Sequence, residues 1–426
     1  MVAADLGGAR LRQARAFRRE SQMEVHARAF VPSRRSTVGL PQPIGRLTLE
    51  AHESLASAER DWRKFESAAA GHPFQRYAWL ETWQARIGAD EGVRPFIVMV
   101  RDASGVLRML LPLAIDRHLG MNRLVPMGDP VCDYHAPLAD ESFAEILTPE
   151  ATATLWRAII ALSGADYGLL TRIPPLLGKV ANPFAALRLH RFSADAHGTR
   201  LGPDWEAFYA ARRSTKTRRR FREKEKALSK LGPVVFAEVE KPEARAELIA
   251  EMMPLKARQL EATAGAFNTF SEPSVQAFYR AIAVDPEATD VSLFKLTAGD
   301  TLVAAALGVV RDGSFYYEVP VYPDLALQRY SPGNLLLHRM MEWAIGRGCT
   351  RFDFTIGDES YKADWCEETW ELGCGAWPRT LLGRIGASAA MASIALKREV
   401  KKRPALFARA TEFRTAIGRL RSWHAS

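Results

Sequence analysis

One series of secondary-structure signals occurs twice along this chain of 426 residues, and it constrains the fold more than any other feature. In each copy, helical stretches and strands joined by a short turn are followed by a later helix and another strand. The first copy has helices at 77–87 and 149–162 and strands at 95–100, 106–115 and 167–173. The second copy has helices at 243–262, 274–282 and from 332 onward, and strands at 291–297, 301–310, 314–322 and 350–356. The repeat predicts an α+β fold of two tandem domains, each a mixed, mostly antiparallel sheet flanked by helices.

The net charge of +9 is concentrated in three segments of the sequence. Residues 1–40 carry eight Arg against three acidic residues, and 212–230 and 383–426 each carry ten Lys or Arg against two Glu, so the rest of the chain is acidic. A protein that binds duplex nucleic acid spreads its basic surface across the fold. The distribution therefore argues against that class and leaves local anion sites open.

These segments also suggest the domain boundaries. We expect a disordered basic extension at 1–40, an N-terminal domain at 41–209, a basic linking helix at 210–232, a C-terminal domain at 233–382 and basic amphipathic helices at 383–426. No apolar run approaches the roughly 20 residues that cross a bilayer, and the Arg-rich N-terminus lacks the apolar core of a secretory signal. A cytoplasmic protein without a transmembrane segment is therefore expected.

The helix that starts at residue 332 has a well-specified beginning. Ser331 can cap it, and Pro332 fits its first position. A strand that leads into a Gly-containing turn at a helix N-terminus offers unpaired N–H groups to an anion, and Arg329 adds a formal charge. The turn is therefore a candidate phosphate cradle, although most such helix starts are only caps.

The strand at 350–356 alternates, with Phe352 and Phe354 on one face and Asp353 and Thr355 on the other. This alternation predicts a half-buried strand. A loop dense in ionisable groups follows it directly, where chemistry is often placed, and contains Asp358, Glu359, Tyr361 and Lys362. The structural alternative is that Asp353 and Lys362 form an ion pair and Asp358 caps the next helix.

Several motifs together resemble the GNAT-type acyltransferases of the CelD/BcsL group, which are linked with cellulose and exopolysaccharide biosynthesis and related to the Fem-type double-GNAT transferases. The resemblance spans roughly residues 72–375, and its most specific parts are RYSPGNLLL at 329–337 and FDFTIGDESYKADW at 352–365. The other parts are HPFQRYAWLETW at 72–83, LLPLAI at 110–115, GDPVCDYHAPL at 128–138 and RRSTKTRRRFREKEKALSKLG at 212–232. The resemblance implies two tandem GNAT-like domains.

The resemblance also implies that an acyl group passes directly from acyl-CoA, with acetyl-CoA the expected donor, to an amine or hydroxyl. The parallel strands at 315–322 and 351–356 would admit the pantetheine arm, and the general base would be Asp353 or Glu318. Tyr361 would return a proton to the leaving thiolate, and Lys362 would neutralise developing charge. The CoA phosphates would lie against Arg329, Tyr330, Ser331, Pro332, Gly333 and Asn334.

In the first copy, the resemblance directs the loop Asp133-Tyr134-His135 toward the acceptor, together with Asp358 and Glu359. His135 is then a candidate second base, and the alternative is a polar surface residue on a loop that Asp133 and Tyr134 orient. Four cysteines are too sparse for a zinc cage, and no His or carboxylate cluster has the spacing of a metal site, so we expect no metal.

The basic segments do not by themselves identify the molecules that the protein binds. The charge run at 212–230 is either a solvated helix face or an anion clamp for CoA, for a sugar-linked or lipid-linked acceptor, or for an aminoacyl-tRNA donor. The segment 383–426 suits an amphipathic helix that contacts the inner membrane surface, or a polar helix packed on the body. Besides the acyl-CoA enzyme, an aminoacyl-tRNA-dependent transferase and a non-catalytic scaffold of a polysaccharide-synthesis complex remain alternatives. The oligomeric state is open.

Overall fold

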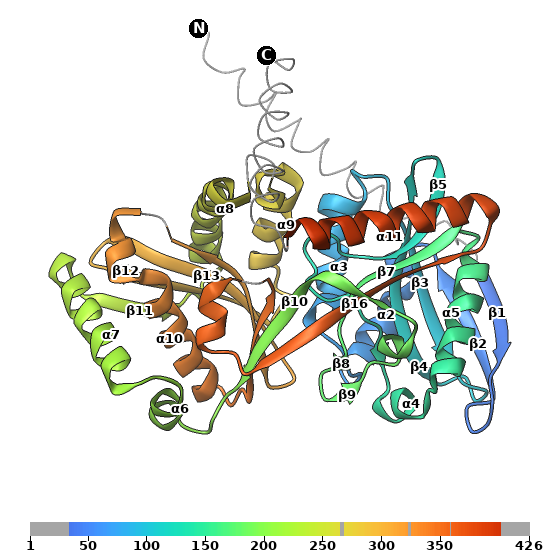
Figure 1. Cartoon of the computed structure of the whole chain (residues 1–426), viewed down its shortest axis with the longest axis horizontal. Helices are drawn as coiled ribbons and strands as arrows, with labels where there is room; N and C mark the ends of the chain where they lie inside the picture. The colour runs from blue at the N-terminus through green and yellow to red at the C-terminus, as the bar shows by residue number, and fades with distance from the viewer. Residues whose placement is uncertain (1–33, 265–267, 323–324, 358, 402–426) are drawn as a thin grey trace, which may run out of the picture. The chain divides into compact units, whose positions relative to one another are not determined.

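The computed structural model describes residues 34–264, 268–322, 325–357 and 359–401 (Figure 1). The extension predicted at 1–40 therefore lies almost wholly outside the described residues, as does the C-terminal segment after 401. None of the described helices is both long and apolar enough to cross a bilayer.

Residues 34–200 form the first half of the described chain, and residues 205–401 form the second half. The strands of the first half are β1 (Arg34–Gly39), β2 (Arg46–His52), β3 (Arg94–Arg101), β4 (Leu107–His118), β5 (Met121–Pro126), β6 (Leu138–Ala139), β7 (Tyr167–Ile173), β8 (Leu176–Leu177), β9 (Val180–Ala181) and β10 (His190–Arg200). Its α-helices are α2 (Leu55–Glu66), α3 (Tyr77–Trp83), α4 (Glu141–Ile146) and α5 (Pro149–Ser163).

The second half repeats this plan. Its strands are β11 (Val234–Glu238), β12 (Val291–Ala298), β13 (Thr301–Arg311), β14 (Ser314–Val321), β15 (Arg351–Ile356) and β16 (Glu368–Pro378). Its helices are α6 (Trp205–Arg212), α7 (Thr215–Leu228), α8 (Pro242–Ala264), α9 (Pro273–Val284), α10 (Pro332–Gly346) and α11 (Leu381–Lys401). The strands and helices expected from the sequence are confirmed, most closely for β7 and for the meander β12–β13–β14.

The two halves share one sheet in which their last strands are exchanged (Figure 1). The order β2-β3-β4-β5-β7 of the first half mirrors β11-β12-β13-β14-β15 of the second, and in each the last two strands are parallel. Strand β16 pairs with β7, while β10 pairs with β15, and β10 and β16 pair with each other in the centre. Each half therefore completes its sheet with a strand that the other half encodes.

Helix α5 shows how the local sequence determines where a helix begins and ends. The Thr148 side chain accepts a hydrogen bond from the Ala151 N–H, and Pro149 occupies the first turn. Gly164 ends the helix in the left-handed region at φ 72°. Local cues of this kind explain why the element boundaries follow from the sequence.

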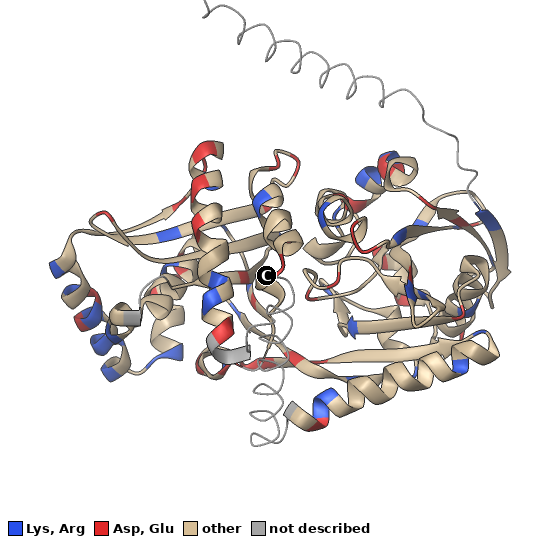
Figure 2. Ribbon diagram, turned by 90° about the horizontal axis from the view of Figure 1, so that it is seen from above, with Lys and Arg blue, Asp and Glu red and all other residues tan. Residues whose placement is uncertain are grey.

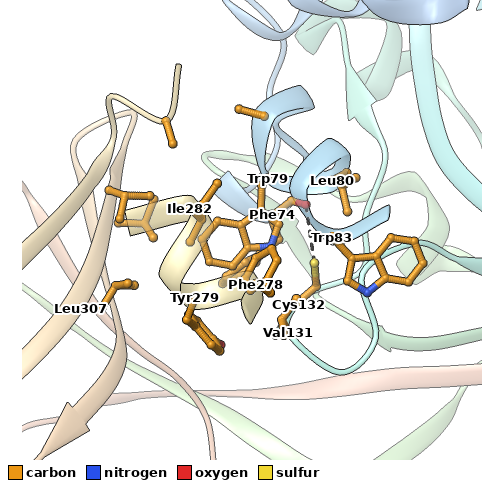
Figure 3. Close-up of a cluster of buried hydrophobic side chains, with 14 of the residues drawn as sticks. Phe74, Trp79, Leu80, Trp83, Val131, Cys132, Phe278, Tyr279, Ile282 and Leu307 are labelled. Atoms are coloured by element: carbon orange, nitrogen blue, oxygen red, sulfur yellow. Dashed lines mark hydrogen bonds between the residues drawn. The ribbon is translucent and has the colours of Figure 1, made fainter. Parts of the chain in front are cut away.

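A core of buried aromatic side chains joins the halves on one face of the sheet (Figure 3). Trp79 of α3 meets Phe278 of α9 edge to face, with ring centroids 5.0 Å apart. Phe74 packs against Trp79 at 5.7 Å, and its carbonyl lies 3.6 Å from the Cys132 thiol. The Trp79–Phe278 contact joins the two halves, so aromatic packing stabilises each half against the other.

The β10–β16 pair can be tested at Gly198. A Cβ at this position would lie 2.5 Å from the Trp370 ring and 3.4 Å from the Phe352 carbonyl, so Gly198→Val should destabilise the protein by about 1–3 kcal/mol through overpacking. Because each half depends on the other's strand, urea unfolding should remain one transition with a lower midpoint.

Gly39→Val is the matched control, since no atom lies within 4 Å of a Cβ there. Separate unfolding of two units in the Gly198 variant would contradict the interdependence of the halves.

Candidate active site

The parallel strands β14 and β15 open along their length. They pair from Ser314–Arg351 to Tyr316–Asp353, and their register pairs end there although both strands continue. Strand β14 also bulges against β13, because Gly308 faces Tyr317 while Leu307 faces Val319, which leaves Glu318 as the extra residue. This confirms the expected splayed pair and places its opening beyond Asp353.

A pocket of about 340 Å³ lies on the α10 face of this opening. It is lined by Tyr317, Tyr322, Gln328, Ser331, Pro332, Gly333, Asn334, Leu337 and Tyr361. A Cβ at Gly333 would lie 2.3 Å from the Tyr322 ring, so only glycine allows this packing. In the first turn of α10, Pro332 has no N–H, and the Asn334 and Leu335 N–H groups donate to the Ser331 carbonyl, so the Gly333 N–H is the one without a partner among the described residues.

Ser331 does not act as the predicted N-cap. Its backbone lies in the left-handed region, at φ 53° and ψ 55°, and its side chain makes no capping hydrogen bond. Instead, the Lys224 ammonium of α7 donates a hydrogen bond to the Ser331 hydroxyl. The basic helix therefore contributes a cation to this turn, whereas the exposed Arg329 guanidinium lies over the Tyr330 ring, 4.8 Å from its centroid.

Asp353 lies on the opposite face of β15 and is only 4% exposed. Its Oδ1 accepts hydrogen bonds from the Tyr134 hydroxyl at 2.7 Å and from the Thr355 N–H at 2.8 Å, while Oδ2 accepts none from the described residues. Burial raises the pKa of Asp353 to about 6, although the Tyr134 hydrogen bond opposes this shift. Strand β15 is thus buried on both faces, and the prediction of a half-buried strand was wrong because central parallel strands are covered on both sides.

Asp353 faces a narrow chamber of about 20 Å³ between the halves. The His72 ring lies between the Tyr316 hydroxyl, 3.2 Å from Nδ1, and the Leu176 carbonyl, 2.9 Å from Nε2. The chamber is lined by His72, Tyr134, Pro174, Pro175, Leu176, Gly178, Ala196, Ser314, Tyr316, Arg351, Asp353, Trp370 and Leu372. A wider pocket of about 520 Å³ shares four of these residues, Leu176, Gly178, Ser314 and Arg351, so the chamber adjoins an open vestibule.

Glu318 and Asp133 form a second acidic group close to Asp353. Glu318 Oε1 is buried and has no hydrogen-bond partner among the described residues. Burial, reinforced by the Asp133 and Asp353 carboxylates, raises the pKa of Glu318 well above its ordinary value and favours its protonated form. Lys256 of α8 donates to the Pro320 carbonyl at 3.1 Å, and burial lowers its pKa to about 8.

In the loop after β15, Lys362 does not have the ion-pair partner that one interpretation of the sequence predicted. Lys362 pairs with Glu359 at 2.9 Å and donates to the Ile356 and Gly357 carbonyls at 3.1 and 3.2 Å, so the alternative of an Asp353–Lys362 ion pair was wrong. Asp358 lies outside the described residues.

The Asp133-Tyr134-His135 loop lies against β15. Asp133 Oδ2 accepts from the Ile356 N–H at 3.4 Å, and Tyr134 reaches Asp353. His135 turns instead toward β7, where Nδ1 lies 3.1 Å from the Thr171 carbonyl, and it is 2% exposed. The alternative of a surface histidine was therefore wrong, and burial lowers the pKa of His135 to about 4.

The corresponding opening of the first half is filled by the chain itself. Strands β5 and β7 pair only at Arg123–Tyr167 and Leu124–Gly168, and the loop 128–136 lies against β7 beyond these pairs, where the His135 N–H donates to the Arg172 carbonyl. Arg172 holds this loop by donating to the Cys132 carbonyl at 2.7 Å and pairing with Asp129 at 2.8 Å. The loop 128–136 of the first half therefore forms part of the site on β15.

Sequence reasoning did not assign several residues of the site. His72 and Tyr316 frame the chamber with Trp370, and Lys224 and Lys256 approach the two faces of the opening. His72 lies in one of the quoted motifs and Lys224 in the basic segment, so a weak signal existed for both. Nothing in the sequence pointed to Trp370 or Lys256.

The comparisons with known proteins agree with this geometry. Residues 215–363, from α7 to the loop after β15, match the family described as the acetyltransferase (GNAT) domain. None of the curated proteins matches the chain. The structure of FemX is similar, with a TM-score of 0.52 and 12% identity over 75% of this chain and 94% of that chain.

Two further structures resemble the chain more loosely. A tandem GNAT protein from the clavulanic acid biosynthesis pathway has a TM-score of 0.42 and 13% identity over 78% of this chain and 99% of its own. The C-terminal domain of a putative lysylphosphatidylglycerol synthetase from Agrobacterium fabrum has a TM-score of 0.47 and 14% identity over 79% of this chain and 95% of its own.

The chain shares its fold with FemX, and residues 215–363 in its second half match the GNAT acetyltransferase domain. The predicted fold class is confirmed, and the domain supports an acyltransferase. Within the described ranges, no three His, Cys, Asp or Glu side chains are grouped as a metal ion would require.

The pKa of Asp353 predicts a pH dependence of stability. The folded chain keeps this proton up to a pH of about 6, whereas the unfolded chain loses it near 3.8. Between these values the folded state binds more protons, so this group makes stability fall as pH rises, by up to about 3 kcal/mol.

Asp353→Asn removes this titration. Urea unfolding at pH 4 and pH 7 should therefore show the variant gaining stability relative to the native chain at the higher pH. An equal difference at both pH values would mean that Asp353 titrates normally.

Proposed function

We propose that the protein is an acyl-CoA-dependent N- or O-acyltransferase, with acetyl-CoA the expected donor, that acts in exopolysaccharide, cellulose or cell-envelope biosynthesis. The observation that carries the proposal is the opening between β14 and β15. It has the α10 pocket on one face and the Asp353 carboxylate on the other. The polysaccharide role rests on the sequence resemblance alone.

The α10 pocket has the chemistry that the donor requires. The helix N-terminus and the Lys224 ammonium favour an anionic pyrophosphate beside Gly333. The pocket wall formed by Tyr317, Tyr322 and Leu337 suits a pantetheine arm that extends toward the opening of the strands.

The reaction needs one base and one acid. Asp353, with a pKa of about 6, is ionised at neutral pH and can take the proton from the acceptor amine or hydroxyl as that atom attacks the thioester carbonyl. The C–S bond then breaks, and Tyr361 in the α10 pocket can give its proton to the departing thiolate. Glu318, which burial keeps protonated, is less suited to be the base and better suited to donate a hydrogen bond.

The chamber and its vestibule suit the acceptor. The Asp353 Oδ2 atom has no partner among the described residues and borders the chamber, where Tyr134, Tyr316 and Trp370 supply ring faces. The wider vestibule can take the remainder of a larger acceptor, such as a sugar or lipid-linked molecule. Donor and acceptor would then meet from opposite faces of the sheet.

One observation favours a second candidate, an aminoacyl-tRNA-dependent transferase. Helix α7 presents exposed cations beside the α10 pocket, among them Arg219, Arg220 and Arg222 (Figure 2). Such a surface suits a nucleic-acid backbone, and the tandem fold matches FemX. A non-catalytic scaffold would need neither Asp353 nor the α10 pocket.

Gly333→Val tests the donor site. The added side chain would clash with Tyr322 and narrow the pocket, so the stabilisation by acetyl-CoA should disappear from thermal unfolding. In the native chain a ligand at about 100 times its dissociation constant stabilises by about 2.7 kcal/mol. Gly346→Ala, at the other end of α10 with no atom within 4 Å, should keep the response.

If the native chain shows no response to any acyl-CoA but binds tRNA with steep salt dependence, the aminoacyl transferase replaces the acyl-CoA enzyme. Loss of that binding in Arg219→Ala/Arg222→Ala would locate it on α7.

Asp353→Asn tests the base. Turnover should fall by about a hundredfold or more while the dissociation constant of acetyl-CoA stays the same, because Asp353 lies on the acceptor face. Glu318→Gln should lose much less turnover, because the glutamine amide resembles the protonated carboxyl of Glu318. Full turnover in the folded Asp353 variant would exclude it as the base.

A further inference from the structure

Helix α11 lies across the central strands β5, β7, β16 and β10 of the sheet (Figure 1). Gly383 and Gly386 are buried, and a Cβ at these positions would lie 2.0 Å from the Asp166 carbonyl and 2.7 Å from the Tyr167 ring. Ala387 packs with Tyr167 and Leu169 on the same side. The helix therefore lies close to β7 through its small N-terminal residues, and further along Ile394 also packs against this cluster.

Four large apolar residues of α11 face outward instead. Leu381, Leu382, Ile385 and Leu396 are 78%, 62%, 67% and 65% exposed, and they are four of the ten exposed large hydrophobic residues described. Positions 381, 385, 389, 392 and 396 lie on one side of a helix, and Ala389 and Ala392 in this series are also exposed. The outer face thus carries an apolar stripe along most of the helix, about 22 Å in length.

A turn beside the helix carries one more exposed large apolar residue. The Met121 sulfur would lie 2.8 Å from a Cβ at Gly386, which places the β4–β5 turn beside α11. At this turn Leu119 is 78% exposed. The turn and the helix together form the α11 surface, defined by Leu119, Leu381, Leu382, Ile385 and Leu396.

Cations border the α11 surface. Arg384 and Lys397 are exposed on the helix and Arg117 on the turn, and none of them forms an ion pair within the described residues. Figure 2 shows Lys and Arg toward both ends of α11, with an uncharged stretch between them. An apolar stripe bordered by free cations complements a surface that is apolar beneath a layer of negative charge.

We propose that the α11 surface docks the protein on a bilayer that contains anionic lipids, with the helix lying in the plane of the interface. The leucine and isoleucine side chains enter the acyl boundary, and Arg117, Arg384 and Lys397 meet the phosphates of the headgroups. A symmetric contact with a second copy of the chain is less suited to this face, because it would bring the same unpaired cations together. The docking is independent of the acyl-transfer proposal.

Vesicle flotation of the full chain tests this docking. Vesicles of phosphatidylcholine with about one third phosphatidylglycerol should bind the protein about tenfold or more tightly than pure phosphatidylcholine at moderate salt. Leu382→Glu/Ile385→Glu should weaken binding to the anionic vesicles by about tenfold or more, because it removes apolar contact and adds negative charge.

Leu231→Glu/Val235→Glu is the matched control, since these residues are 49% and 51% exposed, lie away from α11 and give the same change in net charge. It should keep most of the vesicle binding, and both variants should keep the native circular dichroism. Absence of vesicle binding by the native chain, or equal loss in both variants, would overturn the proposal. A dimer in light scattering that only the α11 variant dissociates, without vesicle binding, would assign the surface to a second copy.

Discussion

The exchange of β10 and β16 is the constraint on which the rest of the structure depends. Because β16 completes the sheet beside β7 and β10 completes it beside β15, neither half has a finished sheet of its own. The exchange brings Trp370 and Leu372 of β16 and Ala196 of β10 to the wall of the chamber that Asp353 faces. Closing the sheet and forming the candidate site are therefore one event, and residues from both halves are held there by backbone hydrogen bonds as well as by side-chain packing.

Each half has an equivalent pair of parallel strands, β5–β7 in the first and β14–β15 in the second, and the two pairs are used in different ways. Near the end of each parallel strand a non-glycine residue lies in the left-handed region, Arg172 at φ 53° in β7 and Thr355 at φ 56° in β15. Such a conformation costs a β-branched residue about 1–3 kcal/mol. In β15 it directs the Thr355 N–H to Asp353, and in β7 it accompanies an Arg172 side chain that closes the first opening with the loop 128–136. One opening is thus left for a ligand, while the other is filled by the loop that carries Tyr134.

The elements whose ends depend on local interactions could be predicted from the sequence. Helix α5 has a capping Thr148 and a terminal Gly164, and the turn at Asp312-Gly313 takes positive φ at both residues, so these elements were found within a few positions. The sequence did not predict the strand exchange, because the partners of β10 and β16 are fixed by long-range pairing. The contact between Tyr134 and Asp353, 219 positions apart, depends on that exchange, and so does the burial of both faces of β15. Ser331 was misassigned as a cap because the left-handed turn and the Lys224 contact come from the packing of α7 on α10.

The position of β16 in the sequence also bears on the order in which the protein can form during synthesis. The first half is complete as a polypeptide when residue 200 leaves the ribosome, yet β7 has no neighbour on one side until residues 368–378 have been translated. At about 5–20 residues per second this interval lasts roughly 10–40 s, during which an apolar strand keeps an open edge. A nascent chain of this design needs protection of that edge for the whole interval, and a product that stops before β16 would keep it exposed.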